Sequence, residues 1–351
     1  MNNKNRILIG LTISGLLVVI IYLIISINEL KKNIAINTDK TIINNVVNGF
    51  HTDLTTTFGD LENELAYVET ANSFGSAISY LQKNQEVYFI TASHNIGVNH
   101  NVNVLLANGN RYNALLVGKD EVLDIAVIKI NVGFNVPVQK LGNSNILKMA
   151  EYVIASGAYH SREFLGSLSL GIVSDHHRQI IKRVNNENYY VDYIQSDLSS
   201  AKGMSGGPLF NMAKDVVGMN LLTGADDGTF SFSLPINEVK IVADQIIDGG
   251  KVNRNDFKIK GRAVSLIKIY ERNELNIALN IAGGLYVKDV LDGGLASRVG
   301  IKDGDIIISI NRQEINSIED LRKMDYQNIS KYNIEIIRNQ KPMLLTGVDE
   351  K

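Results

Sequence analysis

Short apolar runs, many of them alternating with polar residues, fill most of the chain after Glu64, and Gly, Asn and Asp separate them. In chain order the runs are AYVETA, SAISYL, EVYFITA, VNVLLA, YNALLVG, DIAVIKI, EYVIASGA, LSLGIVS, YYVDYIQS, DVVGMNLL and TFSFSLPI. So many short strands without a long helix between them predict a mainly β domain, built as a sandwich or a barrel.

The apolar pattern changes its period after the last of these runs. The segment VKIVADQIIDGGK predicts a helix that ends at Gly249 and Gly250, and the polar segment VNRNDFKIK follows it. We therefore expect one folded domain over residues 65–246, a linker over 247–259 and a second domain over 260–351.

The N-terminal end is different, because residues 7–27 carry no charge. About 20 helical residues cross a hydrocarbon core of about 30 Å, so this segment predicts one transmembrane anchor. A cleaved signal peptide is disfavoured, since the apolar region is long and SINELKKNIAINT contains no small-x-small cleavage site. Lys4 and Arg6 precede the span, which favours a cytoplasmic N-terminus over residues 1–6. The polar residues 28–64 predict a stalk.

The composition excludes several classes of chemistry. The chain carries 35 Lys and Arg against 37 Asp and Glu, with a net charge of −2 at pH 7, so no global positive field favours nucleic acid as a partner. Cys is absent, which excludes thiol nucleophiles and Cys-ligated zinc. Neither a P-loop pattern nor HExxH occurs, so we expect no metal and no cofactor. Any nucleophile must be an oxygen or a nitrogen.

The segment GMSGGPLF singles out Ser205 as a candidate nucleophile. Glycines on both sides of a serine let the backbone turn tightly and direct N–H groups at one point, as an oxyanion hole requires. A serine hydroxyl also needs a base and an orienting acid. His94 follows the expected strand EVYFITA, and Asp124 begins the apolar run DIAVIKI, where a carboxylate is costly unless it is hydrogen-bonded. These contexts predict a catalytic triad.

In chain order, TASH, DIAVIKI, IQSDLSSAKGMSGGPLFN and TFSFSLPIN resemble the motifs of the HtrA (Deg) family of trypsin-like serine proteases. The resemblance covers residues 65–351 and implies a chymotrypsin-like double β-barrel. It implies that His94 is the general base, that Asp124 orients it and that Ser205 is the nucleophile. The N–H groups of Gly203 and Ser205 would form the oxyanion hole. Met204, Ala201 and Lys202 depart from the family's pattern beside the nucleophile, so the loop geometry there stays open.

The primary specificity pocket is expected to be uncharged. A trypsin-type preference for Lys or Arg needs an acid about six residues before the nucleophile, where this chain has Ser199 and Ser200. Phe230 and Phe232 are candidate wall residues. We therefore expect cleavage after small or medium apolar residues.

The C-terminal segment GGLASRVGIKDGDIIISIN resembles the core of a PDZ domain, a small α/β fold that takes a C-terminal peptide as an added strand. The corresponding carboxylate-binding loop is expected at Gly261, Arg262, Ala263 and Val264. The segment SIEDLRKM predicts a helix that begins at Ser317. The alternative is a small β-rich packing domain without a ligand.

The remaining histidines have simpler interpretations. His176 and His177 are expected on a solvated, flexible loop over residues 174–193, because no partner cluster for a metal is visible. His51, His100 and His160 are expected on the surface.

Together these features favour a membrane-anchored serine endopeptidase whose protease and PDZ domains lie outside the cytoplasm. Its expected partners are unfolded or mislocalised proteins, C-terminal peptides and, by family resemblance, two further copies in a homotrimer. The alternative is a non-catalytic PDZ adaptor or stress sensor that uses the protease fold as a scaffold.

Overall fold

The computed structural model describes residues 19–29, 31, 54–98, 101–160, 162–221, 230–250, 252, 257–324 and 331–348. The chain divides into two compact units, residues 1–59 and 60–351, and each is considered by itself. The first unit contains a helix over residues 19–29. Within the described part of the chain, no helix is both long and apolar enough to cross a membrane. The predicted span over residues 7–27 begins outside the described residues.

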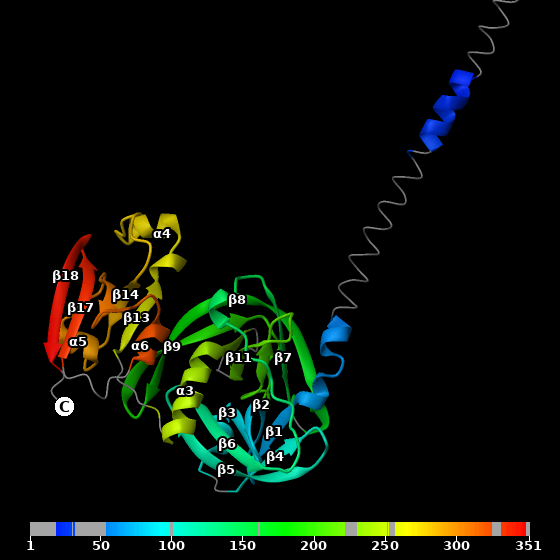
Figure 1. Ribbon diagram of the computed structural model, residues 1–351, viewed down its shortest axis with the longest axis horizontal. Helices are drawn as coiled ribbons and strands as arrows, with labels where there is room; N and C mark the ends of the chain where they lie inside the picture. Colours follow the sequence, from blue (N-terminus) through cyan, green and yellow to red (C-terminus); the bar gives the residue numbers. More distant parts are fainter. Residues whose placement is uncertain are drawn as a thin grey trace, which may run out of the picture. The chain divides into compact units, whose positions relative to one another are not determined.

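The second unit begins with η1 (Leu61–Glu64) and a first closed barrel in the order β1-β2-β3-β6-β5-β4 (Figure 1). Its strands are β1 (Ala66–Glu69), β2 (Phe74–Lys83), β3 (Glu86–Ala92), β4 (Val102–Leu106), β5 (Arg111–Asp120) and β6 (Ile125–Asn131). The alternating apolar positions point inward, so that Val68, Phe89 and Ile128 are fully buried in its core. The short helix α2 (Ser93–Ile96) follows β3.

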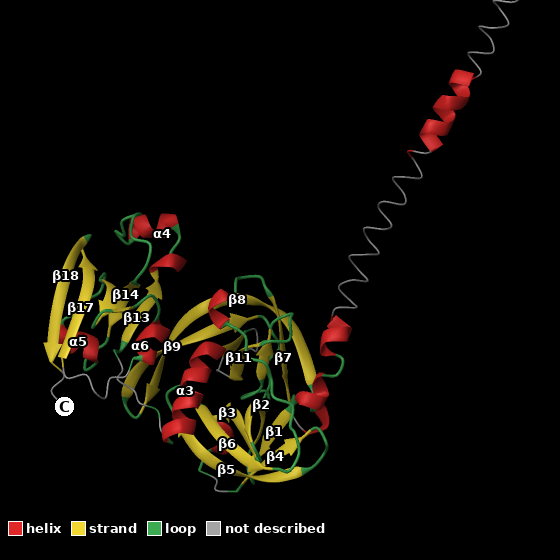
Figure 2. Ribbon diagram, in the orientation of Figure 1, coloured by secondary structure: helices red, strands yellow, loops and turns green. Residues whose placement is uncertain are grey.

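A second closed barrel follows in the order β10-β11-β12-β9-β8-β7. Its strands are β7 (Tyr152–Gly157), β8 (Ser167–Val184), β9 (Glu187–Ser196), β10 (Pro208–Phe210), β11 (Val216–Leu221) and β12 (Ser231–Pro235). The 3-10 turns η2 (Ser144–Ile146) and η3 (Arg162–Phe164) lie in the segments before β7 and β8. Figure 2 shows that both barrels are built of strands, which confirms the prediction of a mainly β domain.

The helix α3 (Ile236–Gly249) packs against β5, β6 and β11 and so contacts both barrels (Figure 1). It ends at the predicted glycines, because Gly250 adopts a left-handed conformation (φ 72°) and donates its N–H to the carbonyl of Ile246 at 2.7 Å. The helix therefore extends past residue 246, the expected end of the first folded domain, to Gly249.

The C-terminal part forms a sheet in the order β13-β14-β15-β17-β18, with β16 paired to β15. The elements are β13 (Ile259–Ala263), η4 (Val264–Leu266), α4 (Ile269–Glu274), β14 (Leu285–Val290), α5 (Leu295–Val299), β15 (Ile306–Ile310), β16 (Gln313–Glu314), α6 (Ile318–Lys323), β17 (Lys331–Arg338) and β18 (Lys341–Val348). Arg338 holds the fully buried Asp305 through two bonds of 2.7 Å. The helix expected at Ser317 is confirmed, since the Ser317 hydroxyl accepts the N–H of Asp320 at 3.2 Å.

The segment over residues 174–193 corrects a prediction. It is not a solvated loop, because β8 and β9 form one long antiparallel hairpin that turns at Asn185 and Asn186, both with positive φ. His176 and His177 lie within β8 and are half-buried. The sequence did not indicate a strand here, because the run of Asp and His residues contains few apolar positions.

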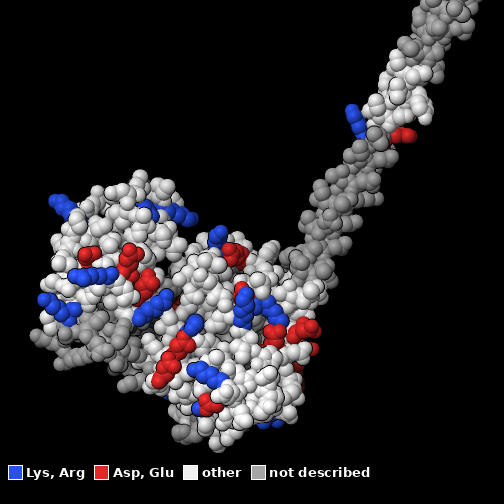
Figure 3. Space-filling model, in the orientation of Figure 1, with Lys and Arg blue, Asp and Glu red and all other residues white. Residues whose placement is uncertain are grey.

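Charged side chains are mixed over the visible face of the molecule. Figure 3 shows Lys and Arg interspersed with Asp and Glu on that face. Among the charged side chains of the described residues, Lys129 pairs with Glu86 at 2.5 Å and Lys214 with Glu64 at 2.7 Å. The second pair connects η1 to the turn before β11.

Candidate active site

The first barrel brings His94 and Asp124 together. His94 lies on α2, immediately after β3, and Asp124 immediately precedes β6, which pairs with β3. The Asp124 carboxylate accepts the backbone N–H of His94 at 2.9 Å and contacts its ring nitrogen Nδ1 at 2.5 Å. The Asp124 carbonyl in turn accepts the N–H of Ser93 at 3.0 Å. Asp124 sits at φ +60°, an uncommon conformation that these three bonds support.

Tyr193 of β9 interacts electrostatically with this carboxylate. Burial raises the pKa of Tyr193 to about 12, and the negative charge of Asp124 contributes to the shift. The Tyr193 ring meets that of Phe232 edge to face, with centroids 5.9 Å apart. Sequence reasoning missed Tyr193, since nothing in YYVDYIQS distinguishes it from a core tyrosine.

Ser205 is held by its backbone carbonyl. That carbonyl accepts the N–H of Ser76 at 3.1 Å and the side-chain amide of Asn95 at 2.9 Å. Asn95 directly follows His94 on α2, so one short helix carries the candidate base and also binds the candidate nucleophile residue. Sequence reasoning missed Asn95. The signal that could have indicated it was a polar residue directly after the candidate base. Ser205 is itself buried, with 2% of its surface exposed.

The glycines around Ser205 are required by close backbone contacts. Gly203 has φ +97°, and a Cβ there would lie 2.3 Å from the carbonyl oxygen of Ala158. Gly206 has φ +84°, and its Cβ would lie 2.3 Å from the carbonyl oxygen of Ser76. Any other side chain would therefore displace β2, which carries Ser76, or the segment after β7 that carries Ala158. This explains the glycine pattern from which the sequence indicated a nucleophile loop.

The peptide between Lys202 and Gly203 has a defined orientation. Its carbonyl accepts the backbone N–H of His160 at 2.8 Å, while the Gly203 carbonyl accepts the Ser76 hydroxyl at 2.8 Å. Because the peptide bond is planar and trans, the N–H of Gly203 points to the side opposite the Lys202 carbonyl, away from His160. His160 is exposed, as predicted, but its backbone contributes to this loop.

The candidate specificity residues lie near one another in the second barrel. β9 pairs with β12, and its last residue, Ser196, lies opposite Ser231, the neighbour of Phe232. Ser199 and Ser200 follow shortly after this end of β9. Phe230 precedes β12 and is 44% exposed. Asp197 accepts the N–H of Ile172 at 2.6 Å.

The candidate peptide-binding residues of the C-terminal part are not on a loop. Gly261, Arg262 and Ala263 belong to β13, and the fully buried Val264 begins η4. Gly261, Arg262 and Ala263 line a cavity of about 280 Å³ together with the first residues of α6. Arg262 also forms an ion pair with Glu271 at 2.8 Å.

The hairpin of β8 and β9 reaches the same region. His177 and Asp192 also line this cavity, and their side chains approach each other to 3.4 Å. Burial and the neighbouring His177 lower the pKa of His176. Within the described segments, no group of three or more His, Asp or Glu residues is placed to hold a metal ion. His51 and His100 lie outside the described residues.

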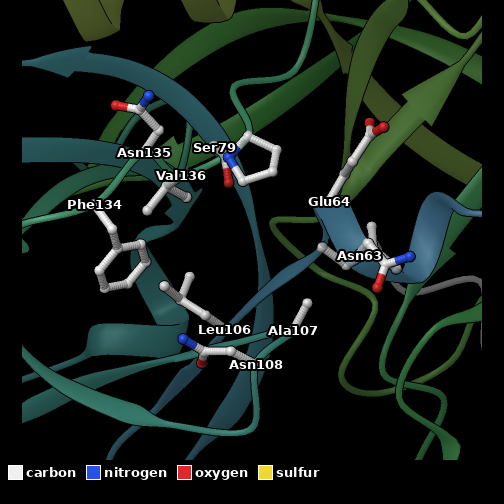
Figure 4. A pocket seen from close by; sticks show the side chains of 11 residues that line it. Asn63, Glu64, Ser79, Leu106, Ala107, Asn108, Phe134, Asn135 and Val136 are labelled. Atoms are coloured by element: carbon white, nitrogen blue, oxygen red, sulfur yellow. The ribbon is translucent and has the colours of Figure 1, made fainter.

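A separate cavity of about 250 Å³ lies beside the first barrel and contains none of the triad residues. Figure 4 shows the side chains of Phe134, Val136 and Leu106 around it, with the amides of Asn63 and Asn108 at its edge.

Comparisons with known proteins identify two regions. Residues 75–219 match the trypsin-like peptidase domain, and residues 263–332 match the PDZ domain. A serine protease Do-like HtrA of Lactobacillus helveticus is 32% identical over 277 residues, which cover 77% of this chain and 66% of that protein. A probable periplasmic serine endoprotease, DegP-like, of Pseudomonas savastanoi is 36% identical over 264 residues, covering 74% of this chain and 52% of that protein.

A solved structure extends the similarity to the fold. The HtrA-type protease AlgW with a tripeptide aligns with a TM-score of 0.59 at 25% identity, covering 85% of this chain and 95% of that chain. The chain spans between about half and two thirds of the length of the curated relatives named above.

Proposed function

Because the chain belongs to the HtrA family of trypsin-like serine proteases with a PDZ domain, we propose that it is a serine endopeptidase that works through His94, Asp124 and Ser205. One observation carries this proposal. Asp124 receives both the backbone N–H and the ring nitrogen of His94, while Asn95, the next residue, binds the carbonyl of Ser205. This arrangement favours catalysis over the alternative of a non-catalytic adaptor.

The proposed chemistry follows from these contacts. With its Nδ1–H donated to Asp124, the ring of His94 presents Nε2 as a base that takes the proton of the Ser205 hydroxyl. The serine oxygen then attacks the peptide carbonyl, and the N–H groups of Gly203 and Ser205 stabilise the negative oxygen. His94 gives the proton to the leaving amine as the peptide C–N bond breaks, which leaves the acyl group on Ser205. Water then attacks this acyl group while His94 takes a proton from the water, and His94 returns that proton to the Ser205 oxygen as the acid product leaves.

Labelling with a serine-reactive fluorophosphonate tests this function directly. Wild-type protein is expected to be labelled at Ser205 and to degrade casein, and Ser205→Ala is expected to do neither. A folded wild-type protein that takes no label and cleaves no unfolded substrate would favour the adaptor.

The specificity pocket is proposed at Ser199, Ser200, Phe230 and Phe232. Asp197, the nearest acid, uses its carboxylate to accept the N–H of Ile172, which supports an uncharged pocket. Cut sites in an unfolded protein, mapped by mass spectrometry, should follow small or medium apolar residues. Cuts that follow Lys or Arg would contradict this assignment.

The proposed setting is outside the cytoplasm, with a single N-terminal anchor and with unfolded or mislocalised proteins as substrates. The helix over residues 19–29 supports an anchor, because its side chains from Val19 to Ile25 are all apolar or aromatic and 44–71% exposed. The Pseudomonas savastanoi relative is named as a probable periplasmic serine endoprotease. Protease added outside spheroplasts should digest residues 65–351, and protection until lysis would reverse the topology.

The proposed assembly is a homotrimer. Its support is a set of exposed apolar side chains on the paired strands β7 and β8 of the second barrel. They are Tyr152 of β7, Leu168 and Leu170 of β8, and Phe164 shortly before β8. These four side chains are 47–53% exposed, and such groups mark interaction surfaces. Analytical ultracentrifugation of the protein in detergent should give three copies per particle, and a single copy would contradict the trimer.

The PDZ domain is proposed to bind the C-terminus of a peptide in the cavity between β13 and α6, with Gly261, Arg262, Ala263 and Val264 near the carboxylate. Calorimetry with C-terminal peptides tests this site. Binding that survives amidation of the peptide's terminal carboxylate would contradict it.

A further inference from the structure

A third cavity lies directly beside the nucleophile loop. It has a volume of about 340 Å³ and is lined by residues 69–74 of the first barrel together with His160, Lys202 and Gly203 of the second. It therefore includes Gly203, whose N–H is a proposed oxyanion donor. None of the four proposed specificity residues lines it.

The cavity is connected to the nucleophile by a short stretch of β2. Phe74 lines the cavity, and Ser76, two residues later, donates its N–H to the carbonyl of Ser205 and its hydroxyl to that of Gly203. A peptide whose carbonyl carbon sits at Ser205 continues in two directions from that point. The residues before the scissile bond, on its acyl side, are assigned to the specificity pocket. This cavity is therefore available to the residues that follow the bond.

The walls of the cavity are held in place. Thr70 and Ser73 close a tight turn, in which the N–H of Thr70 donates to the carbonyl of Ser73 at 2.9 Å and the N–H of Ser73 to the Thr70 hydroxyl at 3.0 Å. The ring of Phe74 stacks on Tyr67, with centroids 6.2 Å apart. The Lys202 backbone is fixed by His160, as described above. A ligand therefore meets a formed site with little ordering cost.

The charges around the cavity favour an anion. The buried carboxylate of Glu69 accepts a bond from Arg111 at 2.7 Å, so its charge is compensated. Lys202 is exposed and forms no ion pair with another described residue. The ring of His160 adds a second nitrogen-bearing group to the lining.

We propose that this cavity binds one of the first two residues after the scissile bond and that Lys202 selects an acidic side chain there. This inference rests on the proposed protease function and adds a preference on the leaving side of the bond. An exposed ion pair is a weak interaction, so the preference for Glu over Gln is expected to be about 1.4- to fivefold in kcat/KM. It should weaken in high salt.

The test uses full-length protein in detergent and internally quenched peptides. The peptides share one acyl side and carry Glu, Gln or Lys at the first or the second position after the cleaved bond. Wild type should cleave the Glu peptide fastest at one of these positions. In Lys202→Gln the Glu-to-Gln ratio should fall to about one, and in Lys202→Glu the Lys peptide should become the best substrate.

Lys148→Gln is the matched control, because Lys148 is an exposed lysine of the same domain that does not line the cavity. Its peptide ratios should equal those of wild type. Ratios between peptides are independent of the fraction of active enzyme, which phosphonate titration measures separately. A wild-type ratio of one, an unchanged ratio in Lys202→Gln or a wild-type preference for Lys would overturn the proposal while leaving the protease function intact. Absence of both labelling and cleavage in wild type would overturn both.

Discussion

The base side and the nucleophile side of the active site are held by different physical means. On the base side, in the first barrel, His94 is positioned by bonds to the carboxylate of Asp124. On the nucleophile side, in the second barrel, Ser205 is positioned by backbone bonds and by glycines that leave no room for a Cβ. The position of His94 therefore depends on the chemical identity of one side chain, Asp124. The position of Ser205 depends on how closely the backbone packs around the glycines.

The largest expected effect comes from removing the reacting groups themselves. Ser205→Ala and His94→Ala should each lower kcat on casein by roughly 10⁴- to 10⁶-fold, because the two residues act as one unit. The double variant should be little worse than either single one. Circular dichroism should show a native fold in each, and activity above a few per cent of wild type would contradict the triad.

Asp124→Asn tests the dependence of the base side on charge. The amide preserves the size of the side chain but cannot hold the required tautomer of His94 or stabilise its cation, so kcat should fall about 10⁴-fold. Asp120→Asn is a useful comparison, since this carboxylate accepts the N–H of Leu123 in the same segment without touching His94. Equal losses of activity in the two variants would indicate damage to the segment and not to the base.

Gly206→Ala tests the dependence of the nucleophile side on shape. The added Cβ meets the Ser76 carbonyl oxygen, so activity should fall more than 100-fold and the free energy of unfolding by more than about 3 kcal/mol. Gly109→Ala is the matched control, because Gly109 has a similar φ of +79° with no atom within 4 Å of the added Cβ. It should lose only about 1–2 kcal/mol. If thermal unfolding shows equal destabilisation in Gly206→Ala and Gly109→Ala, the strain of a positive φ explains the loss and the contact with Ser76 does not.

Asn95→Ala removes one of the bonds that join the two sides. The Ser205 carbonyl keeps the N–H of Ser76, so we expect a modest loss, about tenfold in kcat. Asn113→Ala, at an exposed position of β5, should leave kcat unchanged. Stopped-flow acylation rates with a chromogenic ester provide the measurement. A normal rate in Asn95→Ala would show that α2 positions His94 without this bond.

The effect expected to be smallest at neutral pH concerns Tyr193, whose pKa is raised in part by the charge of Asp124. Its pKa is raised from 10.0 to about 12 in the folded protein, so ionisation destabilises the fold. The associated stability is present below pH 10 and is lost as the pH rises from about 10 to 12. Tyr193→Phe should remove part of this loss, at most about 3 kcal/mol. Urea unfolding of both proteins between pH 9 and 12 measures the difference, and parallel curves would rule out a contribution from Tyr193.

Local patterns in the sequence determined most of the elements and indicated the candidate reacting residues. Alternation of apolar residues indicates the strands, glycine at residue 250 ends α3, and the chemistry of a serine nucleophile leaves few choices besides His94 and Asp124. Each of these depends on neighbouring residues or on residue type, which the linear chain displays. The polar run at His176 and His177 misled the same reasoning, since a strand with few apolar positions looks like a loop.

Only the tertiary structure decided how these residues meet. The bond from Asn95 to Ser205 spans 110 residues and that from Ser76 to Gly203 spans 127. The cavity at Lys202 likewise combines segments of both barrels. No local pattern encodes such contacts, because they arise from the closure and packing of two barrels. The sequence thus determined which groups could react, while the packing of the barrels decided which groups orient them and which cavity receives the leaving side of the substrate.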